Sequence, residues 1–156
     1  MPLPRIPPVA CVYRRVATQA APTALFEHLY GGESFAFLYE SLEAHGGRGR
    51  YSFIGAKPRA VLRCIAAELT LEIDGKVYHD DGPPLEALRT LLQSQSDVPP
   101  VAPFCGGAVG FLGYDTIRWI ERIPAKNPDE IGAPDALFLF PREVICFDHL
   151  EKVVHI

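Results

Sequence analysis

The segment from Glu40 to Pro58, ESLEAHGGRGRYSFIGAKP, brings an acid, a hydroxyl and two guanidinium groups close together in the chain. Glu40 and Ser41 are adjacent, Arg48 and Arg50 lie in a glycine-rich loop, and Tyr51 begins an aromatic run. Such groups can pair with the charges of a small ligand and hydrogen-bond its polar atoms. They are equally suited to an internal Glu40–Arg50 salt bridge that only fixes a hairpin, and the residues alone do not decide between the two.

The loop sequence GGRGR contains backbone N–H groups and positive charge, which together can cradle a phosphate. No helix is expected directly after it, and the G-x-x-x-x-G-K-[ST] pattern is absent. We therefore expect a hairpin loop with solvated arginines. Ser41 has no histidine at a recognisable spacing and no G-x-S-x-G elbow around it, so we do not expect a nucleophile.

Elsewhere the chain lacks the motifs of metal and dinucleotide sites. The stretch GGAVGFLG is without the first glycine of a G-x-G-x-x-G fingerprint, and no acidic residue is placed to bind a ribose, so its glycines indicate close packing. The five histidines show no i, i+4 pair and no neighbouring ligand set. We expect neither a catalytic residue nor a metal or other cofactor in this chain.

The composition is that of an ordinary globular domain: 156 residues, 48% hydrophobic and 22% charged. The net charge of −4 argues against a nucleic-acid partner, which usually requires a basic surface. The prolines that interrupt the first residues, MPLPRIPPVACVYRR, argue against a signal peptide, and no apolar run is long enough for a membrane span. These features predict a cytoplasmic protein with no membrane association.

The four cysteines are too far apart for a C-x-x-C metal or redox motif. Each lies in an apolar, strand-like context, which predicts buried free thiols. They are Cys11, Cys64, Cys105 and Cys146.

The first half of the chain predicts one helix and several strands. TALFEHLYGG is typical of a helix that starts at Pro22 or Thr23 and stops at Gly31. The aromatic run SFAFLYES predicts a strand, and RYSFIGA and RAVLRCIA predict two more. LTLEIDGKVYH alternates apolar and polar residues about Asp74-Gly75, which predicts a tight hairpin.

The second half predicts a helix, a buried strand, a short helix and further strands. PPLEALRTLLQSQ is an amphipathic helix with proline near its first position. The glycine-dense CGGAVGFLGYD predicts a buried strand, and YDTIRWIERIP a short helix capped by Asp115. PDALFLFPREVICFDHLEKVVHI predicts two or three strands. Because its last residues are apolar and uncapped, we expect an unpaired strand edge there and a chain that is the first part of a longer protein, in preference to a short natural chain that ends in a paired strand.

Three motifs, in order, resemble anthranilate synthase component I. The first is FLYES…GRYSFIGAKP, which is similar to the family pattern Leu-Leu-Glu-Ser, a short loop and Gly-Arg-Tyr-Ser-Phe-Ile-Gly, with Tyr39 in place of a leucine. The others are GGAVGFLGYDTIRWIERIP and PDALFLFPREVICFDHLEKVVHI. The resemblance covers the chain from the helix at Thr23 to its end, and it implies an N-terminal, regulatory region over residues 1–156 without the catalytic chorismate-binding domain.

This resemblance implies an α+β fold of packed antiparallel sheets with helices outside. It also implies a part in converting chorismate and ammonia to anthranilate and pyruvate, the first step of tryptophan biosynthesis. Mg²⁺ would serve the full-length enzyme, and the partners would be a glutamine amidotransferase subunit and the chain's own C-terminal catalytic domain. This fragment alone is expected to be inactive.

By the same resemblance, the acid–hydroxyl–arginine segment would bind L-tryptophan as a feedback inhibitor. The residues carried over are Glu40, Ser41, Arg48, Gly49, Arg50 and Tyr51. Two alternatives remain: the corresponding region of aminodeoxychorismate synthase component I, on the folate branch, and a stand-alone amino-acid-binding module. The intact ES…GRYSFIG pattern favours the tryptophan branch.

Overall fold

A computed structural model describes residues 2–8, 10–40, 49–93, 101–124 and 128–156. The chain divides into two compact units. The first comprises Met1–Pro7, Arg59–Ser96 and Ala108–Phe140. The second comprises Pro8–Pro58, Asp97–Gly107 and Pro141–Ile156. Ser41 and Arg48 of the predicted site lie outside the described residues.

The described strands pair in antiparallel fashion, in the order β1-β8-β7-β3-β4-β5, with β2 on β3 and β6 on β7. Their bounds are β1 Arg15–Ala17, β2 Ala36–Glu40, β3 Tyr51–Ile65, β4 Glu68–Ile73, β5 Lys76–Asp80, β6 Val109–Leu112, β7 Ala136–Asp148 and β8 Val153–His155. Helices α1 (Pro22–Tyr30) and α2 (Pro84–Gln93) and the 3₁₀ helix Tyr114–Trp119 complete the elements. The predicted α+β class with antiparallel strands is confirmed. Strands β3 and β7 each supply residues to both units.

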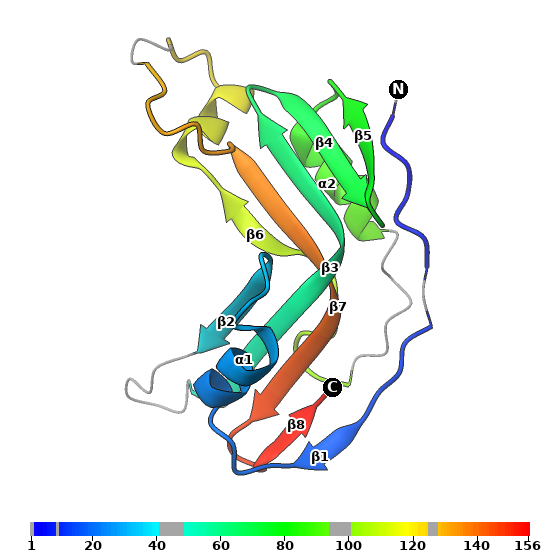
Figure 1. Cartoon of the computed structure of the whole chain (residues 1–156). Helices are drawn as coiled ribbons and strands as arrows, with labels where there is room; N and C mark the ends of the chain where they lie inside the picture. Colours follow the sequence, from blue (N-terminus) through cyan, green and yellow to red (C-terminus); the bar gives the residue numbers. More distant parts are fainter. Residues whose placement is uncertain (1, 9, 41–48, 94–100, 125–127) are drawn as a thin grey trace. The chain divides into compact units, whose positions relative to one another are not determined.

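The first unit is built around the β4–β5 hairpin and α2, which lie beside one another in Figure 1. Leu62 of β3 is the register partner of Leu71 on β4, and both are buried. Leu91 of α2 and Phe140 of β7 join the same apolar core. Leu91 is the fully buried residue of α2, and Ala87 and Leu88 pack partly buried against the same core. Burying one side chain such as Leu91 stabilises the fold by about 1.5–3 kcal/mol.

Two tight turns bound β4. The predicted turn at Asp74 and Gly75 is confirmed, with φ of 47° and 78°. The turn from β3 into β4 uses Ala66 and Ala67, whose φ angles are 49° and 68°. Positive φ at both central residues is the pattern of a type I′ turn, a conformation that is energetically unfavourable for alanine. The sequence carries no turn residue there.

The expectation of two strands across residues 50–66 is wrong, because β3 runs unbroken from Tyr51 to Ile65. Proline is tolerated in a strand at a local distortion, and Lys57, just before Pro58, adopts a φ of 49°. The predicted short helix is a 3₁₀ helix with Gly113 at its N-cap, and no side chain caps it. Asp115 instead pairs with Arg118, at 3.2 Å.

The predicted strand in the GGAVGFLG stretch is β6, and its glycine does mark a close backbone approach. A Cβ atom placed on Gly110 would lie 1.9 Å from the carbonyl oxygen of Leu137 on β7. The expectation that this strand is buried is wrong: Phe111 and Leu112 are about half exposed, at 45% and 50%. Among the described strands β6 pairs with β7 alone, which leaves these side chains uncovered.

In the second unit α1 packs on β2 and the first half of β3 (Figure 1). Tyr30 of α1, Ile54 of β3 and Phe147 of β7 are buried together. Strand β8 lies between β7 and β1, paired with both. The expected unpaired edge at the end of the chain is therefore wrong, because β1, which had no strand signal in the sequence, covers it.

The cysteine prediction is confirmed for Cys64 and Cys146, which are buried, but wrong for Cys11, which is exposed; Cys105 is half-buried. All four are free thiols. None of the helices in the described residues is long and apolar enough to span a membrane.

Candidate functional site

Arg50, one of the six predicted site residues, immediately precedes β3 and makes a two-pronged ion pair with Asp148 at the end of β7. Its Nε atom donates to Oδ1 and Oδ2 of Asp148, at 3.1 and 3.0 Å. Its Nη2 atom donates to Oδ2 at 2.5 Å. Such bidentate pairing holds a guanidinium group in one plane and in one orientation.

The Asp148 carboxylate is held from a second direction by the turn between β7 and β8. The backbone N–H groups of Leu150 and Glu151 donate to Oδ1, at 3.0 and 3.1 Å. Only 3% of the Asp148 side chain is exposed. The hydrogen bonds from Arg50, supported by the backbone N–H groups and the Arg50 charge, lower the pKa of Asp148 to about 2 against the opposing effect of burial. The carboxylate is therefore charged at neutral pH and fully occupied.

Arg50 is held by its backbone as well. Its carbonyl oxygen accepts a 2.8 Å hydrogen bond from the N–H of His149. Its guanidinium carbon lies 4.9 Å from the centre of the Tyr51 ring. The side chain is nonetheless 39% exposed, so part of the guanidinium group faces solvent.

A second acidic residue lies near Arg50, but with looser geometry. Oε1 of Glu151 is 3.7 Å from Nη2, and the Glu151 side chain is 48% exposed. The other Glu151 oxygen pairs with Arg15 at 2.5 Å. Exposed ion pairs of this kind contribute little stability, so Asp148, not Glu151, fixes Arg50.

The register of β2 on β3 separates the predicted site residues onto two faces. Glu40 is the partner of Ser52, and directly paired residues share a face. Tyr51, one residue earlier, belongs to the opposite face with Phe53 and its partner Tyr39. Glu40 and Tyr51 therefore do not converge. The alternative interpretation, a Glu40–Arg50 salt bridge, is wrong, because among the described residues the ion-pair partners of Arg50 are Asp148 and Glu151.

Each face has its own chemistry. On the first, the buried Ser52 hydroxyl lies 2.7 Å from Nε2 of His149, and the His149 ring stacks on Phe147 at 6.1 Å. On the second, Phe104 makes edge contacts with Phe37 and Phe53, at 6.4 and 6.0 Å between ring centres. This aromatic group offers an apolar, flat surface, whereas the Ser52 face offers hydrogen bonds.

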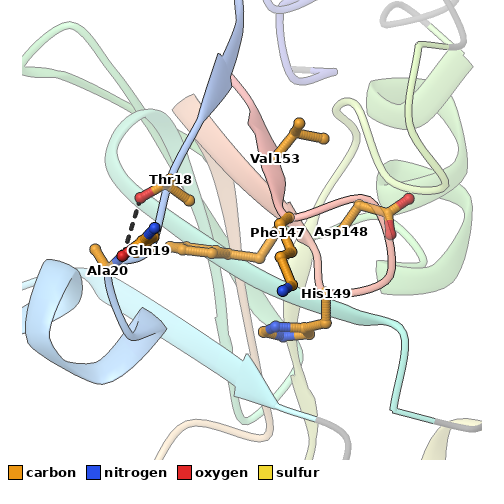
Figure 2. A pocket seen from close by; sticks show the side chains of 8 residues that line it. Thr18, Gln19, Ala20, Phe147, Asp148, His149 and Val153 are labelled. Atoms are coloured by element: carbon orange, nitrogen blue, oxygen red, sulfur yellow. Dashed lines mark hydrogen bonds between the residues drawn. The ribbon is translucent and has the colours of Figure 1, made fainter.

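An open pocket of about 320 Å³ adjoins the turn that carries Asp148. Figure 2 shows the Asp148 carboxylate directed away from Thr18, Gln19 and Ala20. Lys152 is among the lining residues and forms no ion pair within the described residues, so its positive charge is not neutralised there. The pocket is lined by Thr18, Gln19, Ala20, Phe147, Asp148, His149, Lys152 and Val153.

The structure thus brings Gly49, Arg50 and Tyr51 together at the entry to β3 and puts Glu40 across the β2–β3 ladder. Sequence reasoning missed Asp148 and His149, which are separated from their partners Arg50 and Ser52 by almost one hundred residues. Only pairing of β7 beside β3 reveals them, and one sequence holds no signal of that pairing. The part of the chain that is described contains no cluster of His, Cys, Asp or Glu suited to a metal ion.

Comparisons with known proteins identify relatives of this chain in sequence and in structure. No protein-family model matches the chain. Anthranilate synthase component 1 of Acetivibrio thermocellus is 34% identical over 143 residues, 90% of this chain and 29% of that protein. The Streptomyces coelicolor protein of the same name is 36% identical over 86% of this chain and 23% of its own length.

A solved structure gives the same result. Anthranilate synthase component I from Streptococcus pneumoniae TIGR4 superposes with a TM-score of 0.61, at 26% identity, over 94% of this chain and 31% of that one. The chain therefore spans about three tenths of the length of the proteins it matches. The resemblance drawn from its motifs is confirmed: over nearly all its length, this chain is homologous to a part of anthranilate synthase component I.

Proposed function

We propose that this chain is the N-terminal, regulatory region of an anthranilate synthase component I. The observation that carries the proposal is the similarity of about nine tenths of the chain to proteins of that name. In this proposal the remainder of the enzyme binds chorismate and Mg²⁺ and forms anthranilate and pyruvate. A glutamine amidotransferase subunit delivers the ammonia.

The same proposal makes the segment around Arg50 a feedback site for L-tryptophan. Its residues are Glu40, Ser41, Arg48, Gly49, Arg50 and Tyr51. The partly exposed guanidinium group of Arg50 suits the carboxylate of an amino acid, and a carboxylate such as Glu40 suits its ammonium group. Glu40 and Tyr51 occupy opposite faces of the β2–β3 ladder, so a ligand that contacts both must lie across the end of the ladder, where β2 ends at Glu40 and β3 begins at Tyr51. The Tyr51 ring contacts Arg50.

Inhibition of the natural-length protein by tryptophan tests this proposal. Ser41→Ala removes one hydrogen bond to the ligand, worth about 0.5–1.5 kcal/mol, which raises the inhibitory concentration several-fold, up to about tenfold. Ser41→Phe should raise it further because the ring occupies space that the ligand needs. Uninhibited turnover, followed by anthranilate fluorescence with Mg²⁺ and ammonium, should change little in either variant.

The controls separate this proposal from its alternatives. The 156-residue chain alone should give no anthranilate above a buffer blank. Formation of aminodeoxychorismate by the natural-length protein would support the folate branch instead. If the Ser41→Phe protein is inhibited as strongly as the parent, the segment is not the tryptophan site.

A further inference from the structure

We propose that Asp148 is a positioning residue for the tryptophan site and acts by aiming the Arg50 guanidinium group; this inference rests on the proposed function. The resemblance points only to the segment from Glu40 to Tyr51. Asp148 lies in a different part of the chain, where β7 ends and the turn into β8 begins.

The hydrogen-bond donors of Arg50 are divided between two edges of its guanidinium group. Nε and Nη2 form one edge of the guanidinium plane, and both donate to Asp148. Within the described residues Nη1 makes no hydrogen bond and no ion pair. A guanidinium group held along one edge keeps its remaining N–H groups in a fixed direction. Asp148 therefore leaves the outer edge of Arg50 oriented for a ligand carboxylate.

The carboxylate of Asp148 is itself immobile, which such a role requires. The N–H groups of Leu150 and Glu151 fix it, and it is almost fully buried. The neighbouring His149 N–H holds the Arg50 backbone through its carbonyl oxygen. One turn thus fixes both the backbone and the side chain of Arg50.

Glu151 provides a matched contrast on the same turn. It places a negative charge 3.7 Å from Nη2 of Arg50, but it is half exposed and is shared with Arg15. If a negative charge near Arg50 were sufficient, Glu151 would strengthen tryptophan binding as Asp148 does. If the orientation of the guanidinium group decides, only the loss of Asp148 weakens tryptophan binding.

Loss of Asp148 should therefore weaken tryptophan binding without removing any atom that touches the ligand. A flexible side chain must be ordered when the ligand binds, and Asp148 has already ordered Arg50. We expect Asp148→Asn to raise the dissociation constant for L-tryptophan about three- to tenfold. Arg50→Gln should raise it further, and Glu151→Gln should leave it within about twofold of the parent.

The experiment is calorimetric titration of the natural-length protein with L-tryptophan, with a melting temperature for each variant. The set is Asp148→Asn, Arg50→Gln, the double variant and Glu151→Gln. If Asp148 acts through Arg50, the double variant binds no more weakly than Arg50→Gln alone, since the two changes remove one function. Arg50→Lys, which keeps the charge but loses the planar fork, should behave like Asp148→Asn and serves if that variant does not fold.

Trypsin gives a readout that does not depend on ligand binding. Cleavage after Arg50 should be faster in folded Asp148→Asn than in the parent, because the Arg50 side chain and its backbone are less firmly held. A lowered melting temperature with an unchanged dissociation constant would make Asp148 a stabilising residue only and overturn the inference. A parent that binds no tryptophan overturns the proposed function, and this inference with it.

Discussion

The Tyr30 hydroxyl at the end of α1 donates a 2.8 Å hydrogen bond to Oε2 of Glu143 on β7. The same oxygen lies 3.5 Å from Nζ of Lys57, and that ammonium group lies 5.6 Å from the centre of the Tyr30 ring. Tyr30 is 5% exposed. Its burial, together with the bond to Glu143, raises the pKa of the phenol above its ordinary value. These three side chains tie α1 to the strands of the second unit.

We expect Tyr30→Phe to destabilise the protein by about 1.5–3 kcal/mol, because it removes a hydrogen bond to a charged group. At roughly 2–4 °C per kcal/mol, the melting temperature should fall by about 3–12 °C. Tyr13→Phe is the control, since the Tyr13 hydroxyl also bonds a side chain, His155, but at an exposed position. Equal shifts in thermal melts of the two variants would contradict this account.

The elements predicted best from the sequence are those whose ends carry their own signals. Helix α1 begins at a proline, and the β4–β5 hairpin turns at Asp74-Gly75, as expected. The prediction failed where the structure depends on distant parts of the chain. β1 had no signal because its exposed residues pair with β8, which lies at the opposite end of the chain.

A substitution in the Ala66–Ala67 turn should increase the stability of the folded protein. We expect Ala67→Gly to stabilise the protein by about 1 kcal/mol, because a left-handed conformation costs an L-residue roughly 1–2 kcal/mol and costs glycine little. Part of the gain is offset because glycine has more conformational freedom when unfolded. Urea unfolding, with the slope unchanged and the midpoint raised, is the measurement.

The matched control lies on the other side of β4. Gly75 has a φ of 78°, and no heavy atom lies within 4 Å of the position that a Cβ atom would take there. Gly75→Ala therefore tests backbone strain without a steric clash. Gly75→Ala should lower the free energy of unfolding by about as much as Ala67→Gly raises it. If both substitutions shift the midpoint in the same direction, positive φ does not decide the energetics of these turns.

The candidate site was only partly predictable, for a physical reason. The sequence identified Arg50 and Tyr51 by their residue types and by the motif in which they lie. It offered Glu40, which is close in sequence, only as one possible partner of Arg50, whereas the observed partner is Asp148. Which face of a strand a side chain occupies depends on register, and a register that is fixed by hydrogen bonds between distant strands cannot be read from either strand alone.

The thiols should react in the order of their exposure. With an aromatic disulfide reagent at mildly alkaline pH, we expect Cys11 to be labelled first, Cys105 more slowly, and Cys64 and Cys146 only on unfolding. Burial raises the pKa of Cys146 to about 11 and that of Cys64 above its ordinary value, so both lack the reactive thiolate. Mass spectrometry of peptides from the native and urea-treated protein identifies the sites. Early labelling of Cys146 in the native state would contradict the packing described for β7.

The pH dependence of stability isolates the Arg50–Asp148 pair. Its bonds lower the pKa of Asp148 to about 2, below the 3.8 of a free carboxyl, so the folded state favours the charged form. The resulting stability is present above the unfolded pKa and is lost as the pH falls toward the folded value. Below it, the protonated carboxyl resembles the carboxamide of Asn. We therefore expect the stability gap between the parent and Asp148→Asn to be widest above about pH 5 and to close toward about pH 2.

Urea unfolding of both proteins between about pH 2 and pH 7 measures that gap. The control is Glu86→Gln, which removes an exposed ion pair with Arg89 within α2. That change should cost little at any pH, because surface pairs contribute about 0–1 kcal/mol. If the stability difference between the parent and Asp148→Asn stays constant down to about pH 2, the variant is destabilised for a reason other than charge, such as the loss of an acceptor for Arg50. A closing gap, in contrast, would assign the stability to the ionised carboxylate that fixes Arg50.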